Sequence, residues 1–201
     1  MTTDHLIWHD GAQEKSFLEY QKDHSGVFSQ FPFGTFAFAR LDDRLRDSGL
    51  WQKARRSEGR DPMGHTDRQP QVEIWNTECY GPKAYVDVPG NDKQAFAMVT
   101  TLFAGRSRGE VTLKNTDPTQ NPIVDHKHLS DPLDLLVLSE GCRLANEVAV
   151  EGKGTKDFIT GSWPSHLTHH TSKDRDEWGS FVKKNADTCK NLPDTLSMSL
   201  I

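Results

Sequence analysis

The stretch from 105 to 149, GRSRGEVTLKNTDPTQNPIVDHKHLSDPLDLLVLSEGCRLANEVA, decides the fold of this 201-residue chain. Its first part, 109–115, alternates Val111 and Leu113 with polar residues, which is typical of a half-buried strand. Ser130-Asp131-Pro132 then opens the strongest helix, because an aspartate caps a first turn well and proline fits within one. That helix is expected over 131–150, and its buried face recurs at helical spacing through Leu135, Leu138, Cys142 and Ala145.

Two further strands are expected upstream of this stretch, and both are rich in β-branched and aromatic residues. They are QVEIWNTECY at 71–80 and a segment at 95–104 that contains FAMVTTLFA. The turn Arg106-Ser107-Arg108-Gly109 predicts that 96–104 and 109–115 pair as a hairpin. Because the strands are segregated from the helices, the sequence predicts an α+β fold, an antiparallel β-sheet with helices packed on one face.

The flanking segments predict smaller elements. Residues 12–24 suit a short amphipathic helix whose apolar side carries Phe17, Leu18 and Tyr20, and 57–70 reads as a charged loop. The aromatic segment VFSQFPFGTFAFAR has period-two pairs of phenylalanines, which indicate a strand or extended loop. A last helix is expected to begin near Ser172 and to turn Trp178, Phe181 and Val182 inward.

Composition excludes several classes of protein. The net charge is −5 and the basic residues form no stripe, so no nucleic-acid partner is expected. No apolar run reaches the length of a membrane span, and the N-terminus MTTDHLIWHD lacks signal-peptide features, so the sequence taken literally predicts a cytosolic chain. Three widely spaced cysteines indicate neither a disulfide framework nor a zinc knuckle, and Cys142 is expected to be a small buried apolar residue.

The motifs that commonly carry chemistry are missing. The sequence contains no GxGxxG, GxxxxGK[ST] or GxSxG, so it provides no phosphate-binding loop of its own and no nucleophile elbow. His126 and His128 would share one face of a strand, whereas the adjacent His169 and His170 would point apart. With no cysteine or carboxylate at partner spacing, these are expected to be loop or surface histidines, and no metal site is predicted.

A family resemblance rests on the stretch quoted first. Ser107-Arg108-Gly109, a Val-x-Leu strand, Asp117-Pro118, Pro122-Ile123 and a long helix with Gly141-x-Arg143 occur there in order. This pattern resembles the C-terminal, substrate-binding region of the glucose–methanol–choline (GMC) oxidoreductases, a family that includes fungal alcohol oxidases. The matching residues are turn and packing residues, and none of them performs chemistry.

The resemblance implies a two-domain enzyme. One domain would bind FAD, and the sheet-and-helix domain would cover the flavin and bind a small alcohol substrate. A histidine would take the hydroxyl proton while hydride passes to the flavin, giving a carbonyl product. The flavin-binding fingerprint is not in this sequence, so the flavin-binding domain is a partner that this chain lacks, and the chain alone is expected to hold no FAD.

The same resemblance divides the chain into three parts. Residues 1–104 would be the N-terminal part of the substrate-binding domain, 105–189 an incomplete C-terminal domain, and 190–201 an aberrant tail. Asn185-Ala186-Asp187-Thr188-Cys189 resembles the run before the family's catalytic segment, but the sequence then continues without a counterpart of the catalytic histidine. The chain is therefore expected to be a fragment that is truncated at both ends and inactive by itself.

Four residues are the candidates for a functional site. The resemblance places Glu73 where some family members carry a glutamate that hydrogen-bonds an active-site histidine, so Glu73 is the candidate for the catalytic machinery. A solvent-exposed strand glutamate is the alternative. The segment with Phe31, Phe33 and Phe36 corresponds to the substrate-side loop of relatives, which makes these rings candidates for substrate binding, with core packing as the alternative.

The second hypothesis for function comes from another class of protein. The same sheet could serve as an independent, non-catalytic binding or regulatory module. The missing catalytic histidine favours either loss of function or an incorrect gene prediction, and the good pattern up to Cys189 does not exclude the binding module.

Overall fold

The computed structural model describes residues 11–30, 33–54, 58–77, 95–163, 167–188 and 198–200. The elements in these ranges are α2 (Ala12–Asp23), η1 (Val27–Ser29), β1 (Phe33–Ala39), α3 (Gly49–Lys53), β2 (Val72–Thr77), β3 (Ala97–Leu102), β4 (Glu110–Thr112), β5 (Ile123–Asp125), α4 (Pro132–Glu151), η3 (His169–Thr171), α5 (Arg175–Asn185), β6 (Ala186–Thr188) and β7 (Met198–Leu200). None of the helices in these ranges combines the length and the apolar composition that a bilayer-spanning helix requires.

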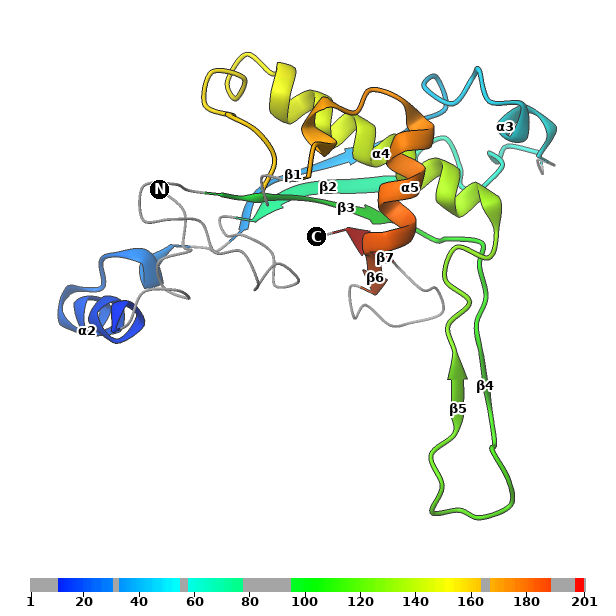
Figure 1. The fold of residues 1–201 in the computed structure, drawn as a ribbon, viewed down its shortest axis with the longest axis horizontal. Helices are drawn as coiled ribbons and strands as arrows, with labels where there is room; N and C mark the ends of the chain where they lie inside the picture. The colour runs from blue at the N-terminus through cyan, green and yellow to red at the C-terminus, as the bar shows by residue number, and fades with distance from the viewer. Residues whose placement is uncertain are drawn as a thin grey trace.

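The main sheet has five strands in the order β1-β2-β3-β7-β6, and every neighbouring pair is antiparallel. Helices α4 and α5 pack against each other, and α4 contacts β2 and β3 along one side of this sheet (Figure 1). Strands β4 and β5 form a separate two-stranded sheet that projects from the body of the molecule. The predicted α+β fold, with an antiparallel sheet and helices on one face, is confirmed.

Helix α4 begins and ends where its sequence indicates. The Asp131 carboxylate accepts a hydrogen bond from the Leu133 N–H at 2.9 Å, Pro132 occupies the first turn, and the helix stops before Gly152. Leu138, Cys142 and Ala145 are buried as predicted. Complete burial also raises the pKa of the Cys142 thiol far above its usual range, so this cysteine is a packing residue. Cys79 and Cys189 lie outside the described residues.

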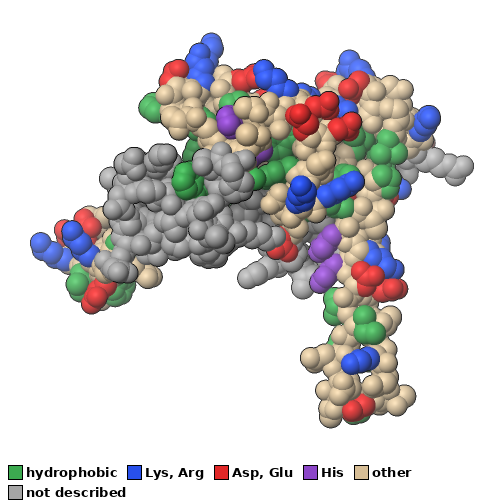
Figure 2. Space-filling model, in the orientation of Figure 1, with side chains coloured by type: hydrophobic (Ala, Val, Ile, Leu, Met, Phe, Trp, Pro, Cys, Tyr) green, Lys and Arg blue, Asp and Glu red, His purple; other side chains and the backbone are tan. Residues whose placement is uncertain are grey.

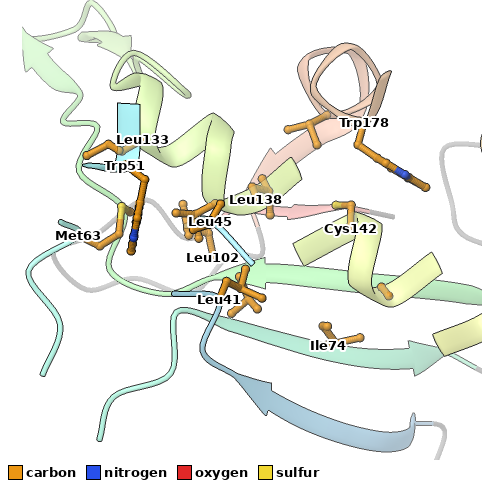
Figure 3. Close-up of a cluster of buried hydrophobic side chains, with 14 residues drawn as sticks. Leu41, Leu45, Trp51, Met63, Ile74, Leu102, Leu133, Leu138, Cys142 and Trp178 are labelled. Atoms are coloured by element: carbon orange, nitrogen blue, oxygen red, sulfur yellow. The ribbon is translucent and has the colours of Figure 1, made fainter. Parts of the chain in front are cut away.

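One hydrophobic core joins the two halves of the chain. Leu41, Leu45 and Trp51 from the segment after β1 pack with Leu102 of β3 and Leu138 of α4 (Figure 3). Trp178 and Val182 of α5 pack in the same core, and Phe181 is partly buried against it. These are the three residues that were predicted to face inward from the last helix. This helix starts at Arg175, after an Asp174 cap, three residues later than expected. Residues 1–104 and 105–189 therefore share a core over their described parts.

The predicted hairpin between 96–104 and 109–115 is wrong. Strand β3 pairs with β2 and β7, whereas β4 pairs with β5 in the register Val111↔Val124. The reason lies in the turn, where the Asp134 carboxylate of α4 accepts the backbone N–H groups of Arg106 and Ser107 at 2.7 Å each. These bonds anchor the turn to the helix, and the chain leaves the sheet from there.

Several expected burials are also wrong. Val111 and Leu113, expected in a half-buried strand, are 66% and 81% exposed. Helix α2 spans nearly the predicted range, but Phe17 and Leu18 on its supposed inner side are exposed. The strand at 109–115 and helix α2 are both amphipathic in sequence, but their apolar side chains do not pack against the core of this chain.

A network of charges lies under the outer surface of α4. Glu140 is completely buried, and its carboxylate accepts hydrogen bonds from Arg44 at 2.6 Å, from Arg143 at 2.7 Å and from Arg175 at 2.7 Å. Glu147 accepts hydrogen bonds from Arg44 and Arg143, and Asp47 accepts one from Arg175. The network ties α4, α5 and the segment after β1 together.

Candidate functional site

The two faces of the main sheet differ in what covers them. Thr100 and Val72 face α4 so closely that a β-carbon on Gly141 would lie 2.8 Å from the Thr100 methyl group. Because side chains alternate along a strand, Glu73 and Trp75 point to the opposite side. We call this side the distal face and define it by residues paired across the strands, namely Phe36 and Phe38 of β1, Glu73 and Trp75 of β2, and Thr101 of β3.

Aromatic rings lie in pairs on the distal face. Phe36 pairs with Trp75 across β1 and β2, and their rings stack with centroids 5.9 Å apart. Phe38 stacks in the same way on Phe103, just beyond β3, at 6.0 Å. Phe36 and Phe38 remain 42% and 62% exposed, so each pair presents apolar surface to whatever adjoins this face. Such a surface suits a flat ring system or a small, mainly apolar molecule.

Glu73 lies in the middle of this surface. Its neighbours across the strands are Phe38 on one side and Thr101 on the other. The side chain is half-buried, and this burial raises the pKa of its carboxyl group above the ordinary value. Glu73 makes no hydrogen bond or ion pair with another described residue, and the buried Thr101 hydroxyl likewise has no partner among them. A carboxyl group in this setting can accept from, or donate to, a polar group that approaches the face.

The three candidate phenylalanines have different outcomes. Phe38 pairs with Glu73 across β1 and β2, and Phe36 lies two residues before Phe38 on the same face. The structure therefore brings the candidates Phe36 and Glu73 together. Phe33 begins β1, but its side chain is not among those described. Phe31 lies outside the described residues.

The histidines take structural positions in the described ranges. The His126 and His128 rings stack with centroids 5.0 Å apart, and nowhere in those ranges do three or more potential ligands gather as a metal ion would require. His169 packs against Phe181, whereas His170 bonds the Ser162 hydroxyl at 2.7 Å through Nδ1, so the two side chains engage different partners.

A buried polar loop, which sequence reasoning missed, positions β2. The segment 57–70 was expected to be a charged loop, yet Asp61 and His65 are almost fully buried. One carboxylate oxygen of Asp61 accepts a hydrogen bond from the His65 backbone N–H at 2.9 Å, and the other accepts one from the Gln71 side-chain amide at 2.6 Å. Gln71 in turn accepts the Leu41 N–H at 2.6 Å, which fixes the strand two residues before Glu73. The apolar pair Pro62-Met63 inside the charged run was the one available signal.

The described helices α4 and α5 do not suit the phosphates of a dinucleotide. Both begin after an aspartate, Asp131 and Asp174, and each carboxylate accepts one backbone N–H of the first turn, from Leu133 and Asp176. A phosphate at either position would meet a negative charge where it needs free donors. Neither of these helix ends therefore suits the pyrophosphate of a dinucleotide.

Comparison with known proteins finds a matching family and similar folds. Residues 105–199 match the family model for the C-terminal part of GMC oxidoreductase. The solved structure of a formate oxidase is 24% identical with a TM-score of 0.71, and the match covers 91% of this chain and 32% of that one.

Two variants of the Aspergillus oryzae formate oxidase, made to study modification of FAD, are also similar to this chain. Both are 24% identical, with TM-scores of 0.71 and 0.69; the matches cover 89% and 87% of this chain and 31% and 30% of those. This chain thus spans about a third of the length of these structures. The family match identifies residues 105–199 as the C-terminal part of a GMC oxidoreductase, and the solved structures show that the chain shares the fold of part of a formate oxidase.

Proposed function

We propose that this chain is the substrate-side part of an FAD-dependent oxidoreductase that acts on the CH–OH group of small donors and converts an alcohol to a carbonyl. The observation that carries the proposal is Glu73, a half-buried carboxyl group with a raised pKa, set beside exposed aromatic rings on the face opposite the one against which α4 packs. Bound flavin would accept the hydride, and the chain would supply the surface against which the substrate is held.

Glu73 serves as a positioning residue in this proposal. Its carboxyl group would hydrogen-bond the histidine that removes the substrate's hydroxyl proton in the intact enzyme, and would hold that ring in one orientation. Phe36, together with Phe31 and Phe33 in the preceding segment, would form the apolar wall against the carbon chain of the alcohol. Formate, the substrate named for the similar oxidases, belongs in the panel of donors because it too carries a transferable hydrogen on carbon.

The chain alone is proposed to be inactive. Its sequence has no glycine-rich turn to hold a pyrophosphate, and α4 and α5 place a carboxylate at the position that a phosphate would need. The proposed division into 1–104, 105–189 and an aberrant tail at 190–201 remains a prediction, which sequencing the transcript across codon 189 would check. Residues 189–197 lie outside the described ranges.

The first prediction concerns flavin and turnover. The purified chain is expected to be colourless after gel filtration with excess FAD and to show no oxidation of primary alcohols or formate with a dye acceptor. Retained flavin absorbance at a one-to-one ratio would contradict the expected lack of a pyrophosphate site. Turnover that disappears in His169→Ala or His170→Ala would show that the active site lies elsewhere.

The second prediction concerns Glu73 in an active assembly. When the chain is combined with the flavin-binding part of a formate oxidase, Glu73→Gln is expected to lower kcat by tenfold or more and to shift the pH dependence of kcat/KM. The amide keeps the shape of the side chain but cannot ionise, so the pH profile separates positioning from packing. Glu151→Gln, at the exposed end of α4, is the control and should leave the profile unchanged. An unchanged profile in Glu73→Gln would refute the role given to Glu73.

A further inference from the structure

The projecting ribbon carries an apolar face that the described chain leaves uncovered. We call residues 109–127 the arm; it contains β4, β5 and the connector between them, and every one of these residues is exposed. Val111 lies opposite Val124, and strand alternation places Leu113 on the same side. These three side chains are 66%, 51% and 81% exposed, and green side chains are visible along the arm in Figure 2.

The other side of the arm is mainly polar. Glu110 lies opposite Asp125, Thr112 lies opposite Ile123, and Glu110 forms an ion pair with Lys127 at 3.0 Å. The arm is therefore an amphipathic ribbon, with one side suited to water and the other suited to burial.

The root of the arm is built to hold it in place. Asp134, which is only 2% exposed, binds two backbone N–H groups at the turn, and the Ser107 hydroxyl accepts the Asp131 N–H at 3.0 Å. Gly109 lets the strands come together, since a β-carbon there would lie 2.5 Å from the Asp125 carbonyl oxygen. At the far end, Asp117 accepts the Thr119 N–H at 2.9 Å and shapes the turn. The arm is thus held at both ends in a defined shape.

A two-stranded ribbon of this kind gains little stability by itself in water. Contiguous exposed apolar surface on a folded domain usually marks an interface. The core of this chain is closed without the arm, by residues such as Leu138 and Val182 that are fully buried. The apolar side of the arm consequently fits a surface supplied by other protein.

We propose that the arm docks, through Val111, Leu113 and Val124, onto the part of a formate-oxidase-type chain that this sequence does not match. Two observations favour this occupant over a second copy of the chain. The arm lies inside the family match at 105–199, so it belongs to the part of the chain that the family shares. The match covers 32% of the formate oxidase chain, so about two thirds of that chain lies outside it. The proposal rests on the family assignment and not on any turnover by the assembly.

The test measures binding of that remaining part. The probe is the portion of the Aspergillus oryzae formate oxidase outside the matched third, in a preparation shown to bind its own matched third. Val111→Ser/Leu113→Ser/Val124→Ser is expected to weaken its affinity for this chain by tenfold or more, measured by light scattering and titration calorimetry. The variant should melt at the temperature of the unmodified chain, because the replaced side chains are exposed.

Val148→Ser is the matched control, since it removes an apolar side chain that is 51% exposed on α4, away from the arm. It should bind the probe as the unmodified chain does. Equal binding by the arm variant, or failure of the unmodified chain to bind a competent probe, would overturn the proposal. A dimer of the unmodified chain that becomes a monomer in the arm variant would assign the surface to a second copy and would overturn it as well. None of these readings depends on catalysis.

Discussion

Replacing Glu140 by glutamine is expected to destabilise the chain by about 3 kcal/mol, equivalent to a fall in Tm of roughly 6–12 °C. Three arginines donate to this fully buried carboxylate at 2.6–2.7 Å. Glutamine removes the negative charge and turns an NH2 group toward guanidinium donors, so the arginines lose their partner inside the protein. Their side chains remain 18–28% exposed, so solvent offsets part of the loss and the estimate lies at the lower end for a broken buried pair.

Urea unfolding checks this result, and Glu147→Gln provides the control. Glu147 binds Arg44 and Arg143, but its side chain is 33% exposed, and a change of less than about 1 kcal/mol is expected. A similar small effect at Glu140 would mean that the three arginines are satisfied without it.

The effect of Glu140 should also depend on pH. Burial raises the pKa of this carboxyl group, but hydrogen bonds from Arg143, Arg175 and Arg44 outweigh it, and the net pKa is lowered. A lowered pKa in the folded state means that the carboxylate stabilises the protein above the unfolded-state pKa of about 4.3 and loses that contribution as the pH falls through the folded-state value. The gap in unfolding free energy between the unmodified chain and Glu140→Gln should therefore be full at pH 6 and shrink at pH 3.

Substitution of Gly141 should have the second largest effect. A β-carbon there would lie 2.8 Å from the Thr100 methyl group and 3.2 Å from Val72, so α4 would have to move off the sheet. Overpacking of this kind costs about 1–3 kcal/mol, against a gain in helix propensity of up to about 1 kcal/mol for alanine. We expect a loss of about 1 kcal/mol for Gly141→Ala and about 3 kcal/mol for Gly141→Val.

Gly179 in α5 is the matched control for this prediction. Its β-carbon would meet only the Ser139 hydroxyl, at an ordinary contact distance of 3.5 Å. Gly179→Ala should therefore stabilise the chain by about 0.5–1 kcal/mol, the helix-propensity gain alone. Changes of the same sign at both glycines, measured by urea unfolding, would show that contact with the sheet does not decide the effect at Gly141.

Local signals explain which elements could be predicted from the sequence. Helix α4 was found because its cap, its proline and its leucine spacing lie next to one another in the chain. The partner of 109–115 was not found, because it depends on Asp134, which holds the turn from 27 residues away and turns the chain out of the sheet. The burial of Glu140 could not be predicted for the same reason. Nothing in the neighbouring sequence distinguishes it from a solvent-exposed helix glutamate, and its partner Arg44 is 96 residues distant.

The candidate site was also only partly predictable from the sequence. Glu73 was singled out through family resemblance, and period-two alternation alone would have left it as an ordinary strand residue. Its placement beside Phe36 on one face depends on strand pairing, which fixes Phe36 opposite Trp75. The buried loop around Asp61 was missed because its carboxylate finds its partners, Arg40 and Gln71, inside the fold, which composition cannot reveal.

The shared core has a consequence for how the chain reaches its fold during synthesis. Leu41, Leu45 and Trp51 emerge from the ribosome early, yet residues that share their core, such as Leu138 and Val182, are made roughly 90 to 140 residues later. At a synthesis rate of roughly 5–20 residues per second, those early apolar side chains wait on the order of ten seconds for their partners. Contacts this distant in sequence also make folding slow. The nascent chain should therefore be most prone to aggregation, and most dependent on chaperones, while the residues before α4 have been made and α4 has not.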